Sequence, residues 1–542
     1  MKLKRTILGP ILVAMFAFVS GGWLLQRGSD DRDSAPDRQV LFEILQRISN
    51  DYVDEHSPDE IYRMAVDGFL QELGDPHTTF MTAADFERLQ IQTTGEYAGL
   101  GIQIAERDGW ITILAPLPGT PADRAGLRSG DRIVEVEGET TEGWSADDAV
   151  AVLRGGPGEP VTISIGRRGV EEPIEFDLVR EEIHVNSVRT SYMIEPSVGY
   201  AKLDVFSETS TSELRQALTR LQSNGMTGII LDLRANPGGL LDQGVSVTDL
   251  FIEAGKPIVE TRARDPRQNV TYRASTAESL DGVPIVVLVD EYAASASEIV
   301  AGALQDHDRA LVIGAPSFGK GSVQTLFPLS GGNYLKMTTG KWYTPSGRSI
   351  QKEAQPASEL ALETTERTIT VDGTAIIPEE ADTTEREEYH TASGRVVYGG
   401  GGIIPDLIVR PDTLTTAEKE FFDAASKAGN TYADVLFRYA VDYVRANPSI
   451  QPTFTITPQM ESELFNLLVA EGVEVTLAQM QSARRLVYRQ LGLEIAQAKW
   501  GQEGRAQRAN LDDNVIQRAV QLLQSATTQG DLFRVSANVA AR

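Results

Sequence analysis

The chain contains no cysteine and only five histidines among its 542 residues. Without cysteine there is no thiol nucleophile, no disulfide framework and no lipid anchor attached to cysteine. The histidines are scattered and lack the paired spacing of a zinc site. They are His56, His77, His184, His307 and His390. We therefore expect neither a metal ion nor a cofactor.

Positive charge is also scarce. Lysine and arginine number 50 against 77 aspartate and glutamate residues, which gives a formal net charge of −27. Nucleic-acid binding needs a clustered basic face, so the composition argues against a DNA or RNA partner. At about 150 residues per domain, the length predicts roughly three or four domains with a large core.

Long apolar runs are absent except near the N-terminus, over residues 7–25. The residues in front of this run are basic: Lys2, Lys4 and Arg5. A basic flank before an apolar run directs the rest of the chain out of the cytoplasm. The run is either a signal peptide or a spanning helix, and we favour a retained signal-anchor. The expected location is the extracytoplasmic, periplasmic side of an inner membrane.

A serine follows a predicted buried strand, at the point where a helix is predicted to begin. The strand is the apolar run 283–289, and Ser295 is the serine. A serine hydroxyl becomes a useful nucleophile only when a neighbouring base takes its proton. Ser295 with Glu298 also forms the pattern of a helix capping box, which is the simpler interpretation of this motif alone. Ser297 is the alternative nucleophile, although it would lie in the first helical turn.

One lysine downstream could supply the base. Lys320 and Gln324 lie in the sequence Gly-Lys-Gly-Ser-Val-Gln. In a strand, positions 320, 322 and 324 would share a face, so that Gln324 could orient Lys320. Residues 314–320 also match a phosphate-binding loop, but Gly321 stands where Ser or Thr is required. Because a strand and not a helix is predicted next, we reject the nucleotide interpretation.

A glycine turn could supply electrophilic help. Residues 228–240 predict a buried strand that runs into Asn-Pro-Gly-Gly, and the glycines are Gly238 and Gly239. Backbone amides aimed at a developing oxyanion contribute about 3 kcal/mol each in acyl transfer. The amide of Ala296 with that of Gly238 or Gly239 would make such an oxyanion hole. The plain alternative is a strand-end turn built from favourable turn residues.

Together these motifs resemble the carboxyl-terminal processing peptidases, or tail-specific proteases, of the S41 serine peptidase family. The segments 295–310 and 318–324 match that family's catalytic block, and the likeness runs from about Val40 to Asp412. The resemblance implies that Ser295 is the nucleophile, Lys320 the general base and Gln324 the residue that positions the lysine. It also implies that the oxyanion amides lie at Ala296 and the Gly238–Gly239 turn.

A second segment resembles a PDZ domain. It contains Gly99, Leu100, Gly101 and Ile102, followed by the run 115–138. Successive amides of this loop would hold the terminal carboxylate of a peptide, and the next strand would accept the peptide as an added strand. A helix predicted over 145–154 would form the other wall, with apolar Ala149, Val150, Val152 and Leu153. The expected partners are protein substrates with free C-termini.

The predicted organisation is a multidomain α/β protein. Its parts are a signal-anchor or signal peptide (1–28), a linker and N-terminal helical element (29–86), a PDZ domain (87–182), a peptidase core (183–412) and a helical C-terminal extension (413–542). Strand, helix and strand alternate over 200–231 and 284–313, which predicts an α/β core. By resemblance the core has the fold of Clp protease and crotonase enzymes. An acidic insertion spans 353–390, with a hairpin predicted over 368–377. For the extension, packing, homo-oligomerisation and partner docking remain open.

The function expected from this resemblance is that of a membrane-tethered serine endopeptidase. It would cleave proteins near or from their C-terminal tails, with a Ser-Lys dyad and tail recognition by the PDZ domain. A catalytically inactive PDZ-containing binding or adaptor protein is disfavoured because the serine, lysine, glutamine and glycine turn are all present. A crotonase-like acyl-CoA enzyme would have no use for a tail-binding domain.

Overall fold

The computed structural model describes residues 35–352, 368–369, 375–376 and 386–540. The predicted signal-anchor (1–28) and most of the acidic insertion lie outside these residues. The chain divides into two compact units, one reaching Thr82 and including Leu326–Thr338, the other comprising Ala83–Thr325 and Thr339–Arg542.

None of the helices in the described part of the chain is long and apolar enough to span a membrane.

The first unit is mainly helical. It contains α2 (Ala35–Asp51), α3 (Pro58–Glu72) and β1 (Thr79–Met81). Helix α3 begins at a capping box in which Ser57 and Glu60 exchange hydrogen bonds, which satisfies backbone amides that a helix leaves unpaired. β1 pairs antiparallel with the residues of β18 that belong to this unit.

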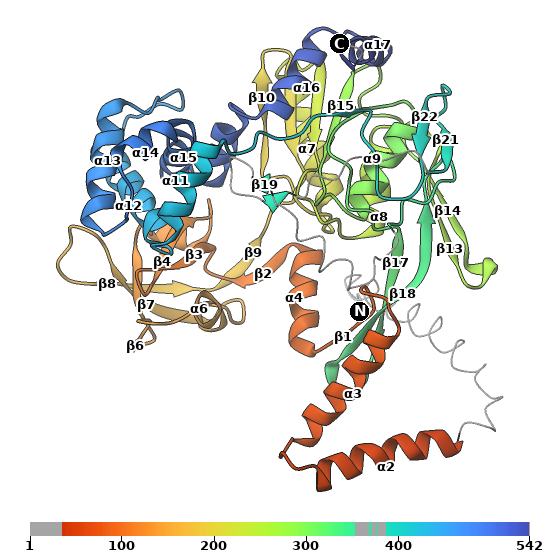
Figure 1. Cartoon of the computed structure of the whole chain (residues 1–542), viewed down its shortest axis with the longest axis horizontal. Coiled ribbons are helices and arrows are strands. Elements are labelled where there is room, and N and C mark those ends of the chain that lie inside the picture. The colour runs from red at the N-terminus through yellow and green to blue at the C-terminus, as the bar shows by residue number, and fades with distance from the viewer. Residues whose placement is uncertain (1–34, 353–367, 370–374, 377–385, 541–542) are drawn as a thin grey trace, which may run out of the picture. The chain divides into compact units, whose positions relative to one another are not determined.

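The second unit begins with α4 (Ala83–Thr94) and continues into the segment that resembles a PDZ domain. Its antiparallel sheet has the order β3 (Ile102–Arg107), β4 (Trp110–Pro116), β5 (Arg132–Val136), β7 (Pro160–Gly166) and β8 (Ile174–Val179), with β6 (Glu139–Thr140) beside β5. Alternate residues of β7 face the core, as the two-residue period of a strand requires. The helices are α5 (Pro121–Ala125) and α6 (Ala146–Leu153), and α6 confirms the helix predicted over 145–154. The segments that enter and leave the module pair with each other: β2 (Glu96–Gly99) is antiparallel to β9 (Glu181–His184) (Figure 1).

The main sheet of the second unit confirms the predicted α/β core. Its order is β10 (Thr190–Glu195), β11 (Val198–Lys202), β12 (Gly228–Asp232), β15 (Ile285–Val289), β16 (Leu311–Gly314) and β23 (Leu407–Ile408). β10 is antiparallel to β11, and the strands from β11 to β23 are parallel. β12 and β15 are buried along their whole length, because helices cover both faces of the sheet.

The two faces of this sheet are covered by helices from different parts of the chain. One face packs against α7 (Ser210–Ser223), α8 (Leu241–Asp249) and α9 (Ala296–Asp306). The other packs against α16 (Asn514–Gln524) and α17 (Gln529–Ala540) (Figure 1). The end of the predicted C-terminal extension is therefore a structural layer of the catalytic core.

The rest of the extension has a hydrophobic core of its own. It consists of α11 (Thr416–Ser426), α12 (Thr431–Ala446), α13 (Pro458–Ala470), α14 (Leu477–Ser482) and α15 (Arg484–Asn510). This helical module contacts the sheet module that precedes the core through Arg107. Its guanidinium lies 2.6 Å from Asp434 and over the ring of Phe437.

Smaller strands complete the second unit. β13 (Pro257–Ala263) pairs with β14 (Val270–Arg273) and with residues 340–343 of β18 (Tyr334–Tyr343), which belong to this unit. β17 (Ser322–Pro328) begins in this unit and pairs with β18. β21 (Glu388–His390) pairs with β22 (Val396–Tyr398). Within the acidic insertion, β19 (Thr368–Ile369) pairs antiparallel with β20 (Ala375–Ile376), which confirms the predicted hairpin.

Candidate active site

Ser295 lies at the sharp turn between β15 and α9. Its backbone angles are φ 55° and ψ −111°, a conformation that residues other than glycine rarely adopt. The turn is held by a hydrogen bond from the Ser295 N–H to Oε2 of Glu298 at 2.8 Å. Ser295 is partly exposed, whereas the alanines on both sides of it are buried. A strained strand-to-helix turn that exposes one serine is the geometry that presents a nucleophile.

Ser297 is in a different environment. Its side chain is fully buried, and its Oγ donates a hydrogen bond to the carbonyl oxygen of Asn236 at 3.0 Å. That hydroxyl holds the glycine turn against the helix. The structure thus separates the two serines that the sequence left as alternatives, because only Ser295 is accessible.

The glycine turn after β12 closes directly onto the serine turn. A Cβ atom added to Gly238 would lie 2.8 Å from Cβ of Ser295 and 3.0 Å from the amide nitrogen of Ala296. Gly239 has φ 146°, and a Cβ there would lie 2.2 Å from the carbonyl oxygen of Phe206. Neither position has room for a side chain: the close approach of the two turns requires glycine at 238, and the contact with the backbone of Phe206 requires glycine at 239.

The amides of the turn are not equivalent. The N–H of Gly238 donates to Oδ1 of Asn236 at 2.9 Å, and Nδ2 of the same asparagine donates to the carbonyl of Leu203 at 2.7 Å. Within the residues that the structure describes, the N–H groups of Gly239 and Ala296 have no hydrogen-bond acceptor. Of the two glycines that the sequence proposed as donors, Gly239 therefore has the available amide.

Lys320 is fixed through its backbone, between β16 and β17. Its N–H donates to Oε2 of Glu298 at 2.9 Å, and its carbonyl accepts from Nε1 of Trp342 at 3.2 Å. The strand expected after the glycine-rich loop is present, but Lys320 lies in the loop before it, so the argument that residues 320, 322 and 324 share a strand face does not hold for Lys320. The amides of Lys320 and Gly321 bond to the side chains of Glu298 and Gln351 instead of a neighbouring strand, and β17 begins at residue 322.

Gln324 lies two residues into β17. Its Nε2 donates to Oγ of Ser322 at 2.7 Å, so residues 322 and 324 share a face as the strand period predicts. A strand and not a helix follows the glycine-rich loop, which also confirms the rejection of a phosphate-binding loop.

Glu298 joins the serine turn to the lysine loop. The carboxylate is fully buried, and its Oε1 accepts hydrogen bonds from Oγ of Ser317 at 2.6 Å and the N–H of Gly319 at 2.7 Å. Its Oε2 accepts the amides of Ser295 and Lys320. Burial raises the pKa of Glu298, and these hydrogen bonds limit the rise. The sequence predicted only a helix cap here, because the bonds to the lysine loop join segments separated along the chain.

A buried network of charged residues lies next to the glycine turn, at the end of the strand that leads into it. Asp232, at the end of β12, accepts the guanidinium of Arg234 at 2.7 Å and the hydroxyl of Tyr200 at 2.8 Å. Burial alone would raise the pKa of Asp232, but the charge and hydrogen bonds of Arg234 outweigh it and lower the pKa. Nη1 of Arg234 reaches Oδ2 of Asp513, the N-cap residue of α16, at 2.8 Å.

These network residues were not identified from the sequence as part of the site. The available signal was that one charged residue, Asp232, ends an otherwise apolar strand and a second, Arg234, lies two residues further on. Buried charges are rarely tolerated without partners, so such a pair marks a specific role. The partner Asp513 had no comparable signal.

A groove lies between the loop 99–102 and helix α6. Gly99, Leu100, Gly101 and Ile102 line one side, and the other is lined by Val150, Leu153 and Arg154. Gly101 has φ 73°, and a Cβ there would lie 2.3 Å from Cβ of Thr120, so only glycine fits. Of the apolar residues predicted for the helical wall, Ala149 packs into the core of the module instead and Val152 is exposed.

His307 is the histidine nearest to the dyad in sequence, and it has a structural role. It caps the C-terminus of α9, and its Nε2 donates to the carbonyl of Pro257 at 2.7 Å. The described residues contain no group of three or more His, Cys, Asp or Glu side chains that could hold a metal ion.

Family comparisons agree with the two kinds of module. The model of peptidase family S41 matches residues 197–359, which contain Ser295, Lys320 and the glycine turn. The model of the PDZ domain matches residues 112–167. The protein is therefore a serine peptidase that carries a PDZ domain.

Individual relatives define the class more closely. The carboxy-terminal-processing protease of Bartonella bacilliformis (strain ATCC 35685) is 42% identical over 313 residues, which cover 57% of this chain and 71% of that protein. The carboxy-terminal processing protease CtpA of Bacillus subtilis (strain 168) is 34% identical over 349 residues, 64% of this chain and 74% of that protein. The solved structure of a photosystem II D1 C-terminal processing protease shares 30% identity, with a TM-score of 0.33, and covers 58% of this chain and 90% of that one. The chain belongs to the carboxy-terminal processing proteases of family S41.

Proposed function

We propose that this protein is an endopeptidase that cleaves proteins near or from their C-terminal tails, with Ser295 as nucleophile and Lys320 as base. The observation that carries the proposal is the shared carboxylate of Glu298. It bonds the backbone of Ser295 and the backbone of Lys320 with one oxygen, so the two segments are held at a common point. Such preorganisation is what covalent catalysis by a serine and a lysine requires.

The reaction follows from the roles of these groups. Oγ of Ser295 attacks the carbonyl carbon of the scissile peptide while the neutral amine of Lys320 takes its proton. The charge that develops on the carbonyl oxygen is stabilised by the N–H groups of Gly239 and Ala296. The Lys320 ammonium then gives its proton to the leaving amine, and water hydrolyses the acyl-enzyme with Lys320 again as base. Gln324 keeps the lysine oriented.

The glycine turn favours this mechanism because it is rigid. An oxyanion donor contributes about 3 kcal/mol only when it is already aimed at the developing charge. Asn236 accepts the amide of Gly238 and so fixes the turn in which the amide of Gly239 is left available. Gly238 then has a supporting role, and Gly239 is the donor.

Selection of the tail is assigned to the groove beside the loop 99–102. Successive amides of a glycine-containing loop complement a carboxylate, and β3 offers an edge to which a peptide strand can add. Val150 and Leu153 give the groove an apolar wall, so apolar terminal residues are favoured.

The site of action that we propose is the extracytoplasmic face of an inner membrane, with the chain tethered by its N-terminal segment. The support is the basic flank and the apolar run 7–25. Substrates would then be proteins of the cell envelope.

An unfolded reporter protein tests the proposal. It is made with one apolar tail in two forms, a free C-terminal acid and a C-terminal amide, so that the scissile bonds are the same. Wild-type enzyme should cleave the acid form and process the amide form about tenfold more slowly, because a charge-assisted hydrogen bond is lost. Cleavage of neither form would favour the inactive binding protein, and equal rates for both would remove tail recognition from the proposal.

A further inference from the structure

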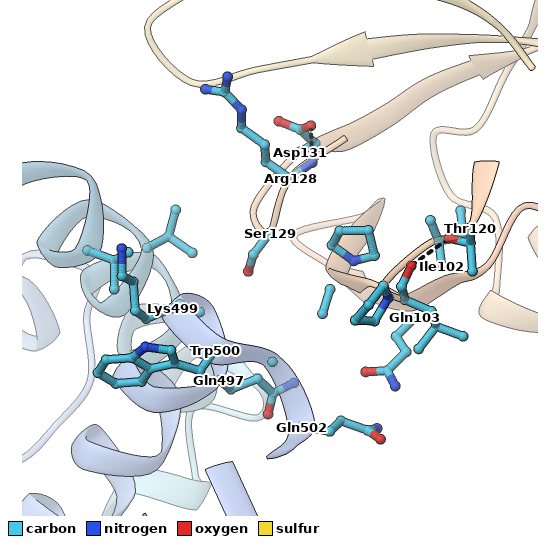
Figure 2. A pocket seen from close by; sticks show the side chains of 18 of the residues that line it. Ile102, Gln103, Thr120, Arg128, Ser129, Asp131, Gln497, Lys499, Trp500 and Gln502 are labelled. Atoms are coloured by element: carbon cyan, nitrogen blue, oxygen red, sulfur yellow. Dashed lines mark hydrogen bonds between the residues drawn. The ribbon is translucent and has the colours of Figure 1, made fainter. Parts of the chain in front are cut away.

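A cavity of about 1170 Å³ adjoins the tail groove and lies between the PDZ module and the C-terminal helices (Figure 2). Its walls come from the ends of β3 and β4 and the segment 128–131 on one side, and from α12 and α15 on the other. Pockets for small molecules usually measure about 300 to 1,000 Å³, so this cavity is large enough for a stretch of polypeptide.

The walls of the cavity are held together by specific contacts. The ion pair of Arg107 with Asp434 joins the PDZ module to α12, and Arg168 pairs with Asp442 of the same helix at 2.6 Å. A Cβ on Gly130 would lie 2.9 Å from Cγ1 of Val441, so backbone and side chain are in close contact there. The cavity therefore lies between two modules that are in direct contact with each other.

Basic side chains that form no ion pair among the described residues lie around this cavity. Three lining residues form no ion pair in the part of the chain that the structure describes: Arg128, Arg445 and Lys499. The ammonium of Lys499 donates to the carbonyl of Pro448 at 2.7 Å, and the charge of a fourth lining residue, Arg189, acts on the carboxylate of Asp204. Among the described residues, the acidic ones in the lining are Asp131 and Glu503, and Asp131 is already paired with Arg167 at 2.6 Å. This local excess of positive charge contrasts with the net charge of the whole chain, which is −27.

Polar groups suited to a polypeptide also face the cavity. Ser129 points into the space that Gln497 and Gln502 border from the opposite wall (Figure 2). Oγ of Ser129 is shielded from solvent and has no hydrogen-bond partner among the described residues. Helix α15 leaves helical geometry at Gly501, with φ 68° and ψ −157°, and this break turns the segment 497–503 along the wall.

We propose that this cavity binds an acidic polypeptide segment of the protein substrate, at a site separate from the tail groove. That the ligand is part of a substrate rests on the proposed function. Tyr97 and Ile102 line both the groove and the cavity, so the two sites adjoin. A substrate with an acidic region outside its last few residues would therefore contact the enzyme twice and bind more tightly than its tail alone.

Peptide binding to the full-length Ser295→Ala protein tests this inference without any need for catalysis. The probes are a fluorescent peptide rich in Asp and Glu and a matched peptide with Asn and Gln, both amidated so that neither offers a tail carboxylate. At low salt the acidic peptide should bind about tenfold more tightly, and added salt should reduce the difference because it screens the charges. Equal affinities of the two peptides would overturn the inference.

Substitutions locate the site. Arg128→Gln with Arg445→Gln should weaken binding of the acidic peptide about fivefold or more, since two attractions are removed. The control is Arg215→Gln with Arg410→Gln, which removes the same charge from exposed positions outside the cavity lining. Thermal unfolding establishes that both variants are folded. An equal loss in the control, or no loss in the cavity variant, would place the acidic peptide elsewhere and overturn the site.

The outcome for this site is distinguishable from the outcome for the proposed function. If wild-type enzyme cleaves no reporter while the cavity variant loses acidic-peptide binding, the acidic polypeptide site stands and its identification as a substrate site fails. If cleavage is tail-dependent but acidic and neutral peptides bind alike, the proposed function stands and the cavity site fails.

Discussion

The backbone N–H of Lys320 donates a hydrogen bond of 2.9 Å to Oε2 of Glu298, three residues beyond the serine of the active site. The same oxygen accepts the N–H of Ser295 at 2.8 Å. One buried carboxylate therefore sets the relative position of the two groups assigned to catalysis.

Replacement of this carboxylate should disrupt the site. In Glu298→Gln one oxygen becomes an NH₂ group that faces two donors, so buried amides lose their acceptor. Each unsatisfied donor costs about 1 to 3 kcal/mol, and we expect a lower melting temperature with peptidase activity reduced at least about a hundredfold. Glu253→Gln, at an exposed position, is the matched control and should change neither quantity. Wild-type kcat in a folded Glu298→Gln variant would argue against the positioning role.

The ion pair between Arg234 and Asp513 should matter for catalysis although Asp513 is remote in sequence. Asp513→Asn preserves the helix cap of α16, because asparagine is also a favourable N-cap residue, and removes the charge. We expect a stability loss of about 2 kcal/mol and a lower kcat with little change in KM, since the network supports the glycine turn. Steady-state kinetics measure kcat and KM, and thermal unfolding measures the loss of stability.

Asp512→Asn is the control for this pair, because Asp512 is the exposed neighbour and has no ion pair with Arg234. If Asp513→Asn and Asp512→Asn had the same kcat as wild type, the C-terminal layer would stabilise the core without influencing the turn.

The helical module should lose stability in acid through Glu418. Hydrogen bonds from Arg485 lower the pKa of Glu418 from about 4.5 to about 2. A carboxylate whose pKa is lower in the folded state stabilises that state above its unfolded pKa and loses this effect as pH falls through the folded value. The melting temperature of Glu418→Gln should therefore lie below that of wild type at pH 7, and the gap should narrow below about pH 4.5. The control is Glu420→Gln, at an exposed position on the same helix. Its melting temperature should stay close to that of wild type at every pH.

The identity of the base can be tested with a substitution that retains the positive charge. Lys320→Arg should be inactive, because a guanidinium cannot be deprotonated in a protein and so cannot accept the serine proton. The backbone bonds of residue 320 to Glu298 and Trp342 do not depend on the side chain, so the variant should fold. Lys341→Arg, exposed on β18, should remain active. Retained activity in Lys320→Arg would mean that another group takes the proton.

Much of this site could be predicted because its signals are local. Ser295 follows a strand whose apolar run is visible in the sequence, and the strand, helix and strand on either side have their expected order. Helix α16 lies in the extension that the sequence predicts to be helical, but the sheet against which it packs could not be predicted, because periodicity does not identify a partner.

Other parts of the site depend on contacts between distant segments. Arg234 and Asp513 are separated by 279 positions, and no pattern in either segment points to the other. Glu298 has the same sequence pattern as an ordinary capping box, so its bonds to the lysine loop were hidden by a simpler explanation. The choice between Gly238 and Gly239 required the geometry of Asn236, which accepts one amide and leaves the other.

The most direct test of the dyad is the cleavage rate of an unfolded protein by two serine variants made side by side. Ser295→Ala should have no activity above background, whereas Ser297→Ala should be folded and measurably active, with some loss of stability because its hydroxyl bonds to Asn236. The contradicting result is cleavage by Ser295→Ala together with loss of activity in a folded Ser297→Ala protein. In that case the nucleophile, and with it the proposed mechanism, would have to be reassigned.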